Sequence, residues 1–250
     1  MMTKAKYVEI LGFRVFSDKL DLIPINNNTA RVINTISPNS YGIAIKDEEF
    51  RTSLKKSDYL VLDGVYFAFA SLVLKGKNIK RNQGPDVFDH FINRSSINKK
   101  KVFFLGSTSA TLEKINARML KEYPDVETMY YSPPFKTEFT EEDNNQMVGI
   151  VNEFNPDILF VGMTCPKQEK WAVKNKEILK TGLIISVGNV FDWFAGTQKA
   201  IHPVWYKLRL AWLIRIFLRP EIFKRNIGNQ LRFFREVTLL FLRLKKLENA

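Results

Sequence analysis

The chain has 250 residues, of which 45% are hydrophobic and 26% are charged, a composition that excludes a disordered or low-complexity protein. Its 38 Lys and Arg residues exceed its 26 Asp and Glu residues, which gives a formal net charge of +12. Residues 199–250 hold 12 of the basic and 3 of the acidic residues, so a nearly neutral body carries a strongly basic C-terminal segment.

Short apolar runs alternate with helical segments along the first 190 residues. Strands are predicted at 31–36, 58–62, 101–105, 127–131, 157–161 and 182–187. Helices are predicted at 48–56, 110–122, 144–152 and 166–179. This alternation favours an α/β fold of the Rossmann-like type, in which a mostly parallel sheet carries helices on both faces.

Beyond residue 200 the strand-like runs stop, and aromatic residues alternate with arginines. Apolar or β-branched residues recur there at helical spacing, at Phe223, Ile227, Leu231, Phe234, Thr238 and Phe241. Arg225, Arg232 and Arg243 have spacings that keep them near one side of such a helix. We therefore expect an α/β domain over 1–198 and a basic, amphipathic helical appendage over 199–250.

The basic appendage fits two kinds of partner, a nucleic acid or an anionic membrane surface. No stretch approaches the ~18 apolar residues that a spanning helix needs. The N-terminal segment lacks the apolar region of a secretory signal. We expect a cytoplasmic protein that is attached to a membrane peripherally, if at all.

Polar residues directly after strands are site candidates, because in open α/β sheets the ligand crevice lies beyond the carboxyl ends of the strands. Asp63 follows the strand predicted at 58–62. A carboxylate at such a crevice can act as a general base near neutral pH. Asp63 is also half of an Asp63-Gly64 pair, which is a strong turn signal, and the residues alone favour the turn.

Polar residues at three other strand or helix ends could bind a substrate, but each could instead have a purely structural role. Ser37 and Asn39 could orient sugar hydroxyls or cap a helix. Gly106 and Ser107 open a helix whose amides could hold a phosphate, although the run matches no known phosphate-loop pattern. Gln168 lies in the first turn of a predicted helix near the crevice, where an ordinary capped helix start is the alternative.

The sequence offers little to a metal ion or a redox centre. The single cysteine, Cys165, cannot form an intramolecular disulfide, and we expect it to be inert. Two histidines are too few for a zinc cluster, and no Asp-x-Asp follows a strand. We therefore expect no metal and no cofactor. If a diphosphate departs here, arginines or backbone amides must neutralise its charge.

Seven ordered blocks, within residues 7–230, resemble the WecG/TagA/CpsF glycosyltransferase family. They are TISPN at 35–39, SDYLVLDGVYFAFASLVLKG at 57–76, KRNQGPDVF at 80–88, FFLGST at 103–108, FVGMTCPKQEKW at 160–171, SVGNVFDWFAGTQKAIHPVW at 186–205 and RLAWLIRIFLRPEIFKR at 209–225. The resemblance implies an inverting, metal-independent transfer of a sugar, usually of the N-acetylmannosamine type, from a UDP-sugar to a polyprenyl-diphosphate-linked sugar. Such a step belongs to cell-surface polysaccharide or teichoic acid synthesis at the inner face of the cell membrane.

The resemblance also implies roles for particular residues. Asp63 matches the catalytic base. The other matching positions are Ser37, Asn39, Arg81 and Gln168 for the donor and acceptor pocket, and Asp192 lies in the block expected near the nucleotide. Gly106 and Ser107 stay candidates for substrate binding through the backbone amides that could hold a phosphate. The appendage is expected to touch the membrane and to bring a cation to the lipid diphosphate, with Arg215, Lys224, Arg225 and Arg232 as candidates.

The sequence departs from the family pattern mainly in its C-terminal blocks. Ser37 replaces a Thr but keeps the hydroxyl, Ala211 replaces a Glu, and Arg219 stands where an acid is common. We also expect an apolar body surface beneath the appendage that could serve a homo-oligomer. The alternatives are a nucleic-acid-binding α/β protein, which leaves the polar strand ends unexplained, and an epimerase-like enzyme, for which the nicotinamide fingerprint is missing.

Overall fold

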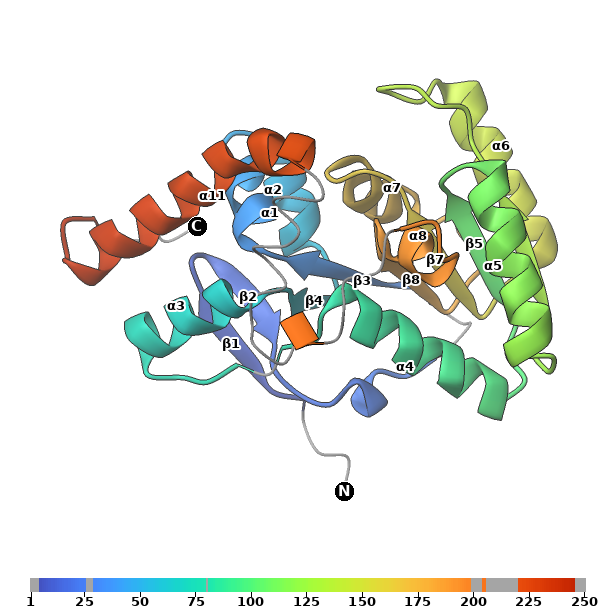
Figure 1. Ribbon diagram of the computed structural model, residues 1–250, viewed down its shortest axis with the longest axis horizontal. Coiled ribbons are helices and arrows are strands. Elements are labelled where there is room, and N and C mark those ends of the chain that lie inside the picture. The colour runs from blue at the N-terminus through green and yellow to red at the C-terminus, as the bar shows by residue number, and fades with distance from the viewer. Residues whose placement is uncertain (1–4, 26–28, 80, 199–203, 206–219, 246–250) are drawn as a thin grey trace.

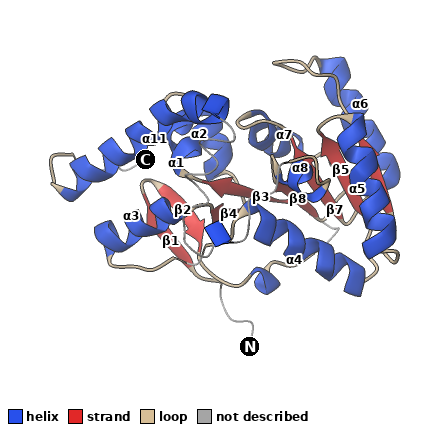
Figure 2. Cartoon of the chain, in the orientation of Figure 1, coloured by secondary structure: helices blue, strands red, loops and turns tan. Residues whose placement is uncertain are grey.

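A computed structural model describes residues 5–25, 29–79, 81–198, 204–205 and 220–245 of the chain. A central sheet lies between layers of helices, and a small hairpin lies at one end (Figure 1). Figure 2 shows the strands at the centre with helices around them. The predicted α/β class is confirmed.

The central sheet has six strands in the order β4-β3-β8-β7-β5-β6, and every neighbouring pair is parallel. The strands are β3 (Arg31–Ile36), β4 (Tyr59–Leu62), β5 (Val102–Gly106), β6 (Thr128–Tyr131), β7 (Ile158–Gly162) and β8 (Leu183–Ser186). All six were predicted, with ends that differ by at most one residue. The four residues of β4 and β8 and the five of β5 and β7 are all buried, as expected for strands that are covered on both faces.

Helices cover the two faces of the sheet. They are α1 (Pro38–Ala44), α2 (Glu48–Lys55), α3 (Val65–Lys75), α4 (Gly84–Ile97), α5 (Ser109–Glu122), α6 (Glu141–Phe154), α7 (Lys167–Asn175), α8 (Val190–Phe194) and α11 (Pro220–Phe241). Alternate strand residues point to opposite faces, so Phe104 packs with α4, α5 and α8, whereas Phe103 packs with α6 and α7. Figure 1 shows α4 below the sheet and α7 above it.

An N-terminal β-hairpin was not predicted from the sequence. β1 (Tyr7–Ile10) pairs with β2 (Phe13–Phe16), and Leu11 and Gly12 form the two-residue turn. Both turn residues have positive φ, 51° and 77°, as the tightest hairpin turns require. A Leu-Gly pair is a weak turn signal because leucine rarely adopts this conformation, so the pattern is visible only once the pairing is known.

The predicted amphipathic helix near the C-terminus is present as α11, and it packs on the body. Phe233 is buried between Tyr41 of α1 and Phe67 of α3, with ring centroids 5.7 Å and 5.2 Å away. Gly42 makes this approach possible, because a Cβ there would overlap the backbone carbonyl of Asn229. The expected boundary at 198/199 borders residues outside the described ranges and stays a prediction.

None of the helices within the described ranges is long and apolar enough to cross a lipid bilayer. The 22 residues of α11 exceed the length of many spanning helices. Its sequence nevertheless contains charged residues on several turns, including Lys224, Arg232 and Arg235. The finding agrees with the sequence, in which arginines interrupt every long apolar run of the C-terminal segment.

The packing of α11 predicts that substitutions of two neighbouring phenylalanines lower the stability of the fold by different amounts. Phe233→Ala should lower the free energy of unfolding by about 3–5 kcal/mol, because it leaves a cavity in a buried aromatic cluster. Phe234→Ala is the matched control, since the Phe234 side chain is 40% exposed, and it should cost about 1 kcal/mol or less. Urea unfolding followed by circular dichroism measures both. Equal effects would contradict the observed orientation of α11.

Candidate functional site

The parallel sheet brings the predicted site residues to one edge, where the carboxyl ends of the strands lie. Asp63 follows β4, and Ser37 follows the neighbouring strand β3. The backbone N–H of Asp63 donates to the carbonyl oxygen of Ile36 at 2.9 Å, which continues the ladder of β3 and β4 by one bond. The predicted base and the predicted polar pair are therefore neighbours, although they are 26 residues apart in sequence.

The turn after Asp63 is also real. Gly64 has a φ of 87°, a conformation that favours glycine, and α3 starts at the next residue. The turn interpretation of Asp63-Gly64 and the site interpretation of Asp63 are thus compatible. At Gly64 the chain leaves the sheet and enters α3, whereas Asp63 is still paired with β3 through the carbonyl oxygen of Ile36.

Arg81 lies at the same corner. The backbone N–H of the next residue, Asn82, donates to the carbonyl oxygen of Leu62 at 3.1 Å, and Arg81 itself is exposed. Two residues further on, α4 begins at Gly84, where a Cβ would lie 3.1 Å from Val190, the first residue of α8, and 3.7 Å from the carbonyl oxygen of Val187, which follows β8. The segment from Arg81 to Gly84 therefore joins the end of β4 to the end of β8.

Ser37 and Asn39 have different partners. The Ser37 hydroxyl accepts from the backbone N–H of Ser40 at 3.3 Å and caps α1, as the structural alternative predicted. The Asn39 side-chain oxygen accepts from the Asn229 side-chain nitrogen of α11 at 3.1 Å. Arg232 donates to the Asn229 side-chain oxygen at 2.7 Å. A continuous chain of hydrogen bonds thus links a basic residue of α11 to the edge of the sheet.

Asn229, which bonds to a predicted site residue, was missed by sequence reasoning. It contributes nothing to the apolar stripe of α11, and asparagine is common on helix surfaces. The only signal was its position three residues before Arg232, which places both side chains on one side of a helix. The partner, Asn39, is 190 residues away.

Gln168 joins two strand ends. Its side-chain oxygen accepts from the backbone N–H groups of Met163 after β7 and Gly188 after β8, at 3.3 Å and 2.9 Å. Its side-chain nitrogen donates to Glu169 at 2.9 Å. Because Gln168 is buried, these bonds give it a structural role at the edge. Contact with a substrate stays a prediction.

Glu169, next to Gln168, is a buried acid. Its side chain is 2% exposed, and burial raises the pKa of its carboxyl above the ordinary value. Cys165 lies close enough to hydrogen-bond it, and burial together with the nearby Glu169 raises the pKa of the Cys165 thiol. A thiol kept protonated is a poor nucleophile, which agrees with the expectation that Cys165 is inert.

Gly106 and Ser107 lie at the end of β5, where the neighbouring parallel strand β7 approaches closely. A Cβ at Gly106 would overlap the backbone of Gly162 at the end of β7. The backbone N–H of Ser107 donates to the Gly162 carbonyl at 3.0 Å, so this amide is already bonded within the protein. A phosphate at this turn would need other donors, and the phosphate assignment stays a prediction. Asp192 lies on α8 and accepts from the Thr197 hydroxyl at 3.3 Å.

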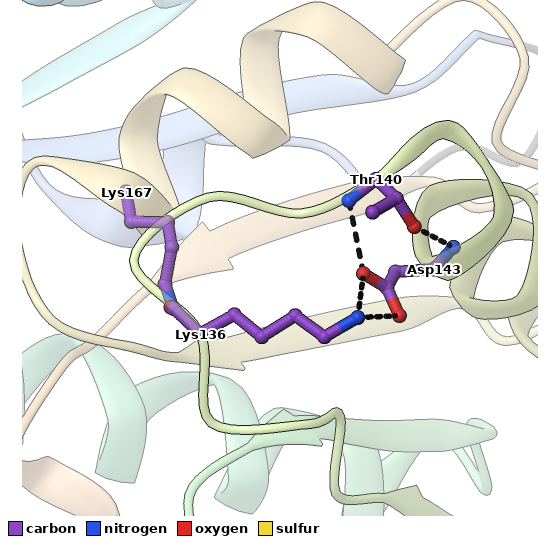
Figure 3. Close-up of polar contacts among 4 residues, drawn as sticks. All are labelled: Lys136, Thr140, Asp143 and Lys167. Carbon is purple, nitrogen blue, oxygen red and sulfur yellow. Dashed lines mark hydrogen bonds and ion pairs between the residues drawn. The ribbon is translucent and has the colours of Figure 1, made fainter.

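A loop near the start of α7 is fastened by charged groups (Figure 3). Lys136 donates to both carboxylate oxygens of Asp143 at 2.9 Å and 2.8 Å, and this bond holds the pKa of Asp143 below its usual range. Thr140 and Asp143 cap the start of α6 reciprocally. Lys167, in the first turn of α7, donates to the Lys136 carbonyl at 2.7 Å. Lys167, from the segment PKQE at 166–169, therefore also holds the loop around Lys136 in place.

The predicted basic residues of the appendage are only partly described. Arg215 lies outside the described residues. Lys224 and Arg225 are exposed on α11, and Arg232 is half-buried against Asn229. Within the described part of the chain, no three His, Cys, Asp or Glu side chains form a group that could hold a metal ion. The absence of a metal from the reaction stays a prediction.

Several buried polar atoms near this edge have no hydrogen-bond partner within the described residues. They are the side-chain nitrogen of Asn82, the hydroxyl of Ser186 and one carboxyl oxygen of Glu169. Ser186 ends β8, Asn82 lies beside the end of β4, and Glu169 is in the first turn of α7. Each unsatisfied buried group in a native protein needs an explanation, and a bound ligand or water is the usual one.

At this edge a carboxylate and several polar side chains lie beyond the carboxyl ends of parallel strands, where open α/β sheets have their ligand crevice. Comparison with known families identifies the class of enzyme. The model of the glycosyl transferase WecG/TagA/CpsF family matches residues 9–247, and the chain belongs to this family. It is therefore a glycosyltransferase, as predicted.

Two curated relatives are similar over most of their lengths. A Bacillus subtilis (strain 168) protein is 27% identical over 213 residues, which cover 85% of this chain and 81% of the relative. A Staphylococcus aureus (strain NCTC 8325 / PS 47) protein is 26% identical over 186 residues, which cover 74% and 71%. Both are named N-acetylglucosaminyldiphosphoundecaprenol N-acetyl-beta-D-mannosaminyltransferase.

The buried acid predicts a particular pH dependence of stability. Above the ordinary pKa of 4.5, Glu169 ionises in the unfolded chain while burial keeps it protonated in the folded one. Folding then takes up a proton, so this residue's contribution to stability falls as the pH rises towards the raised pKa, by at most about 1.4 kcal/mol per pH unit. Glu169→Gln removes this slope, so the variant should gain stability relative to the wild type between pH 5 and pH 8.

Urea unfolding at each pH measures this difference. Glu113→Gln is the control, because Glu113 is exposed on α5 and the substitution should leave the slope unchanged. Parallel curves for the wild type and Glu169→Gln would contradict a protonated Glu169.

Proposed function

We propose that this protein transfers an N-acetylhexosamine, most simply N-acetylmannosamine, from a UDP-sugar to a polyprenyl-diphosphate-linked N-acetylglucosamine. The names of the two relatives support this donor sugar and this acceptor. The observation that carries the proposal is the position of Asp63, which the bond to Ile36 holds beside Ser37, with Arg81 at the same corner. A step in the synthesis of a cell-surface polysaccharide is the corresponding biological role.

In the proposed mechanism Asp63 is the general base. Its carboxylate takes the proton of the attacking acceptor hydroxyl, and that oxygen forms a bond to the anomeric carbon of the donor. The bond from the anomeric carbon to UDP breaks, and UDP leaves with the electron pair. Because the attack comes from the side opposite to UDP, the configuration at that carbon inverts.

The departing diphosphate needs positive charge or hydrogen-bond donors. Arg81 is a candidate cation, because the backbone bond from Asn82 to Leu62 places it at the end of β4, where Asp63 also lies. Arg215 and the exposed Lys224 and Arg225 of the appendage are the further candidates. Donors fixed in place before the reaction stabilise the developing charge without a cost for reorganisation. Ser37, Asn39 and Gln168 shape the pocket, with Asp192 near the nucleotide.

The acceptor lipid lies in a bilayer, so the enzyme has to work at the membrane surface. We propose that the protein is peripheral on the cytoplasmic face, held by the basic residues and the exposed apolar side of α11. Each basic residue close to an anionic leaflet contributes roughly 1 kcal/mol. The salt sensitivity of such binding distinguishes it from simple insertion.

Replacement of the base tests the proposed reaction. Asp63→Asn should lower turnover by about 10²–10⁴-fold, the usual contribution of a positioned general base, and should leave UDP binding intact. Turnover is measured as UDP release with UDP-N-acetylmannosamine and a short-chain polyprenyl-diphosphate N-acetylglucosamine, and binding by calorimetry. Asp125→Asn, at the exposed turn before β6, is the matched control and should keep full activity. Full activity of Asp63→Asn would exclude Asp63 as the base.

A further inference from the structure

Helix α3 presents an apolar side to solvent. Val65, Phe69 and Leu72 follow one another at helical spacing and are 51% to 62% exposed. On the opposite side Phe67 and Ala70 are buried against the body. The helix contains no charged residue before Lys75, its last residue. A surface helix of a globular protein ordinarily has a polar outer side, and a helix that is apolar on all sides is ordinarily buried. Helix α3 is apolar on its outer side although that side is exposed.

Helix α11 has the same property. Phe233 and its neighbours Val237 and Leu240 pack against the body, while Leu231, Phe234 and Phe241 are 40% to 60% exposed on another side. The exposed residues belong to the apolar stripe that the sequence predicted. Phe233, Val237 and Leu240, which pack on the body, do not belong to that stripe.

The exposed sides of α3 and α11 form one surface. The rings of Tyr66 and Phe234 meet edge to face, with centroids 5.3 Å apart. Figure 1 shows both helices extending to the same side of the molecule, away from α5 and α6. We call this surface the α3–α11 face; its apolar members are Val65, Tyr66, Phe69, Leu72, Leu231, Phe234 and Phe241.

Basic residues accompany the α3–α11 face. Exposed members are Lys75 and Lys77 at the end of α3, and Lys224, Arg225 and Arg235 on α11. Of the two acids within α11, Glu236 pairs with Lys245 at 2.6 Å, and Glu221 is exposed in the first turn. An apolar surface with a basic surround matches an anionic bilayer, where side chains enter the boundary layer and cations meet the headgroups. Two copies of the same surface would bring like charges together, which favours lipid over self-association.

We propose that the α3–α11 face docks on an anionic membrane, with α3 inserting its exposed side chains together with those of α11. Membrane contact is then a property of the catalytic body as well as of the appendage. Because α3 begins two residues after Asp63, this docking sets the base at the membrane surface, where the diphosphate of a lipid-linked acceptor lies. This inference rests on the proposed function for the identity of the acceptor, but not for membrane binding itself.

A double substitution on α3 tests the docking surface. Phe69→Glu combined with Leu72→Glu removes two inserting side chains, each contributing about tenfold, so affinity for vesicles should fall about 100-fold or more. The control combines Ile97→Glu and Leu120→Glu, which alter side chains that are 81% and 65% exposed on α4 and α5. Flotation with vesicles of phosphatidylglycerol and phosphatidylcholine measures binding, and thermal unfolding verifies the fold. A second variant, Phe69→Ser with Leu72→Ser, repeats the test without added charge.

Enzyme assays separate this inference from the proposed function. The α3 variants should release UDP normally with a water-soluble short-chain acceptor and lose turnover with an undecaprenyl acceptor in vesicles. Unchanged vesicle binding by both α3 variants would overturn the inference. So would a wild-type dimer that becomes monomeric in the variants while vesicle binding persists, because the face would then join two copies. Wild-type protein that binds vesicles through α3 and releases no UDP would instead overturn the proposed function.

Discussion

The parallel pairing of β3 with β4 is the constraint on which the site depends. It places Ile36 opposite Leu62, and the next ladder bond joins the Asp63 N–H to the Ile36 carbonyl. Asp63 is therefore held by backbone bonds on a rigid sheet rather than by a loop. A base with a fixed position is what a direct displacement requires, since small errors in the geometry of attack are costly.

The packing of α11 on α1 has a second consequence for this edge. The close approach at Gly42 lets Asn229 reach Asn39, and Arg232 bonds to the far side of Asn229. The basic C-terminal helix and the carboxyl edge of the sheet are thus mechanically connected. Nine of the chain's twelve excess positive charges lie in residues 199–250, the segment that contains this helix.

The six strands of the sheet could be predicted because buried parallel strands are continuous apolar runs that end in polar or glycine residues. Asp63 and Ser37 followed from the same rule. Helix α3 was not predicted because its sequence, VYFAFASLVLK, is apolar almost throughout. It therefore lacks the alternation of apolar and polar residues by which helical periodicity is recognised. The bond of Asn229 to Asn39 and the bond of Gly188 to Gln168 escaped prediction because the partners are 190 and 20 residues apart, and single-sequence patterns carry no information on such contacts.

Hydrogen–deuterium exchange with UDP tests most directly whether the carboxyl edge of the sheet is the substrate site. Protection should appear in peptides that cover residues 36–42, 63–66, 81–84 and 187–192, which the structure brings to that edge. Peptides at the amino edge, such as 55–58 and 99–101, should exchange at unchanged rates. Protection confined to the amino edge or to the outer surfaces of α5 and α6 would contradict the account.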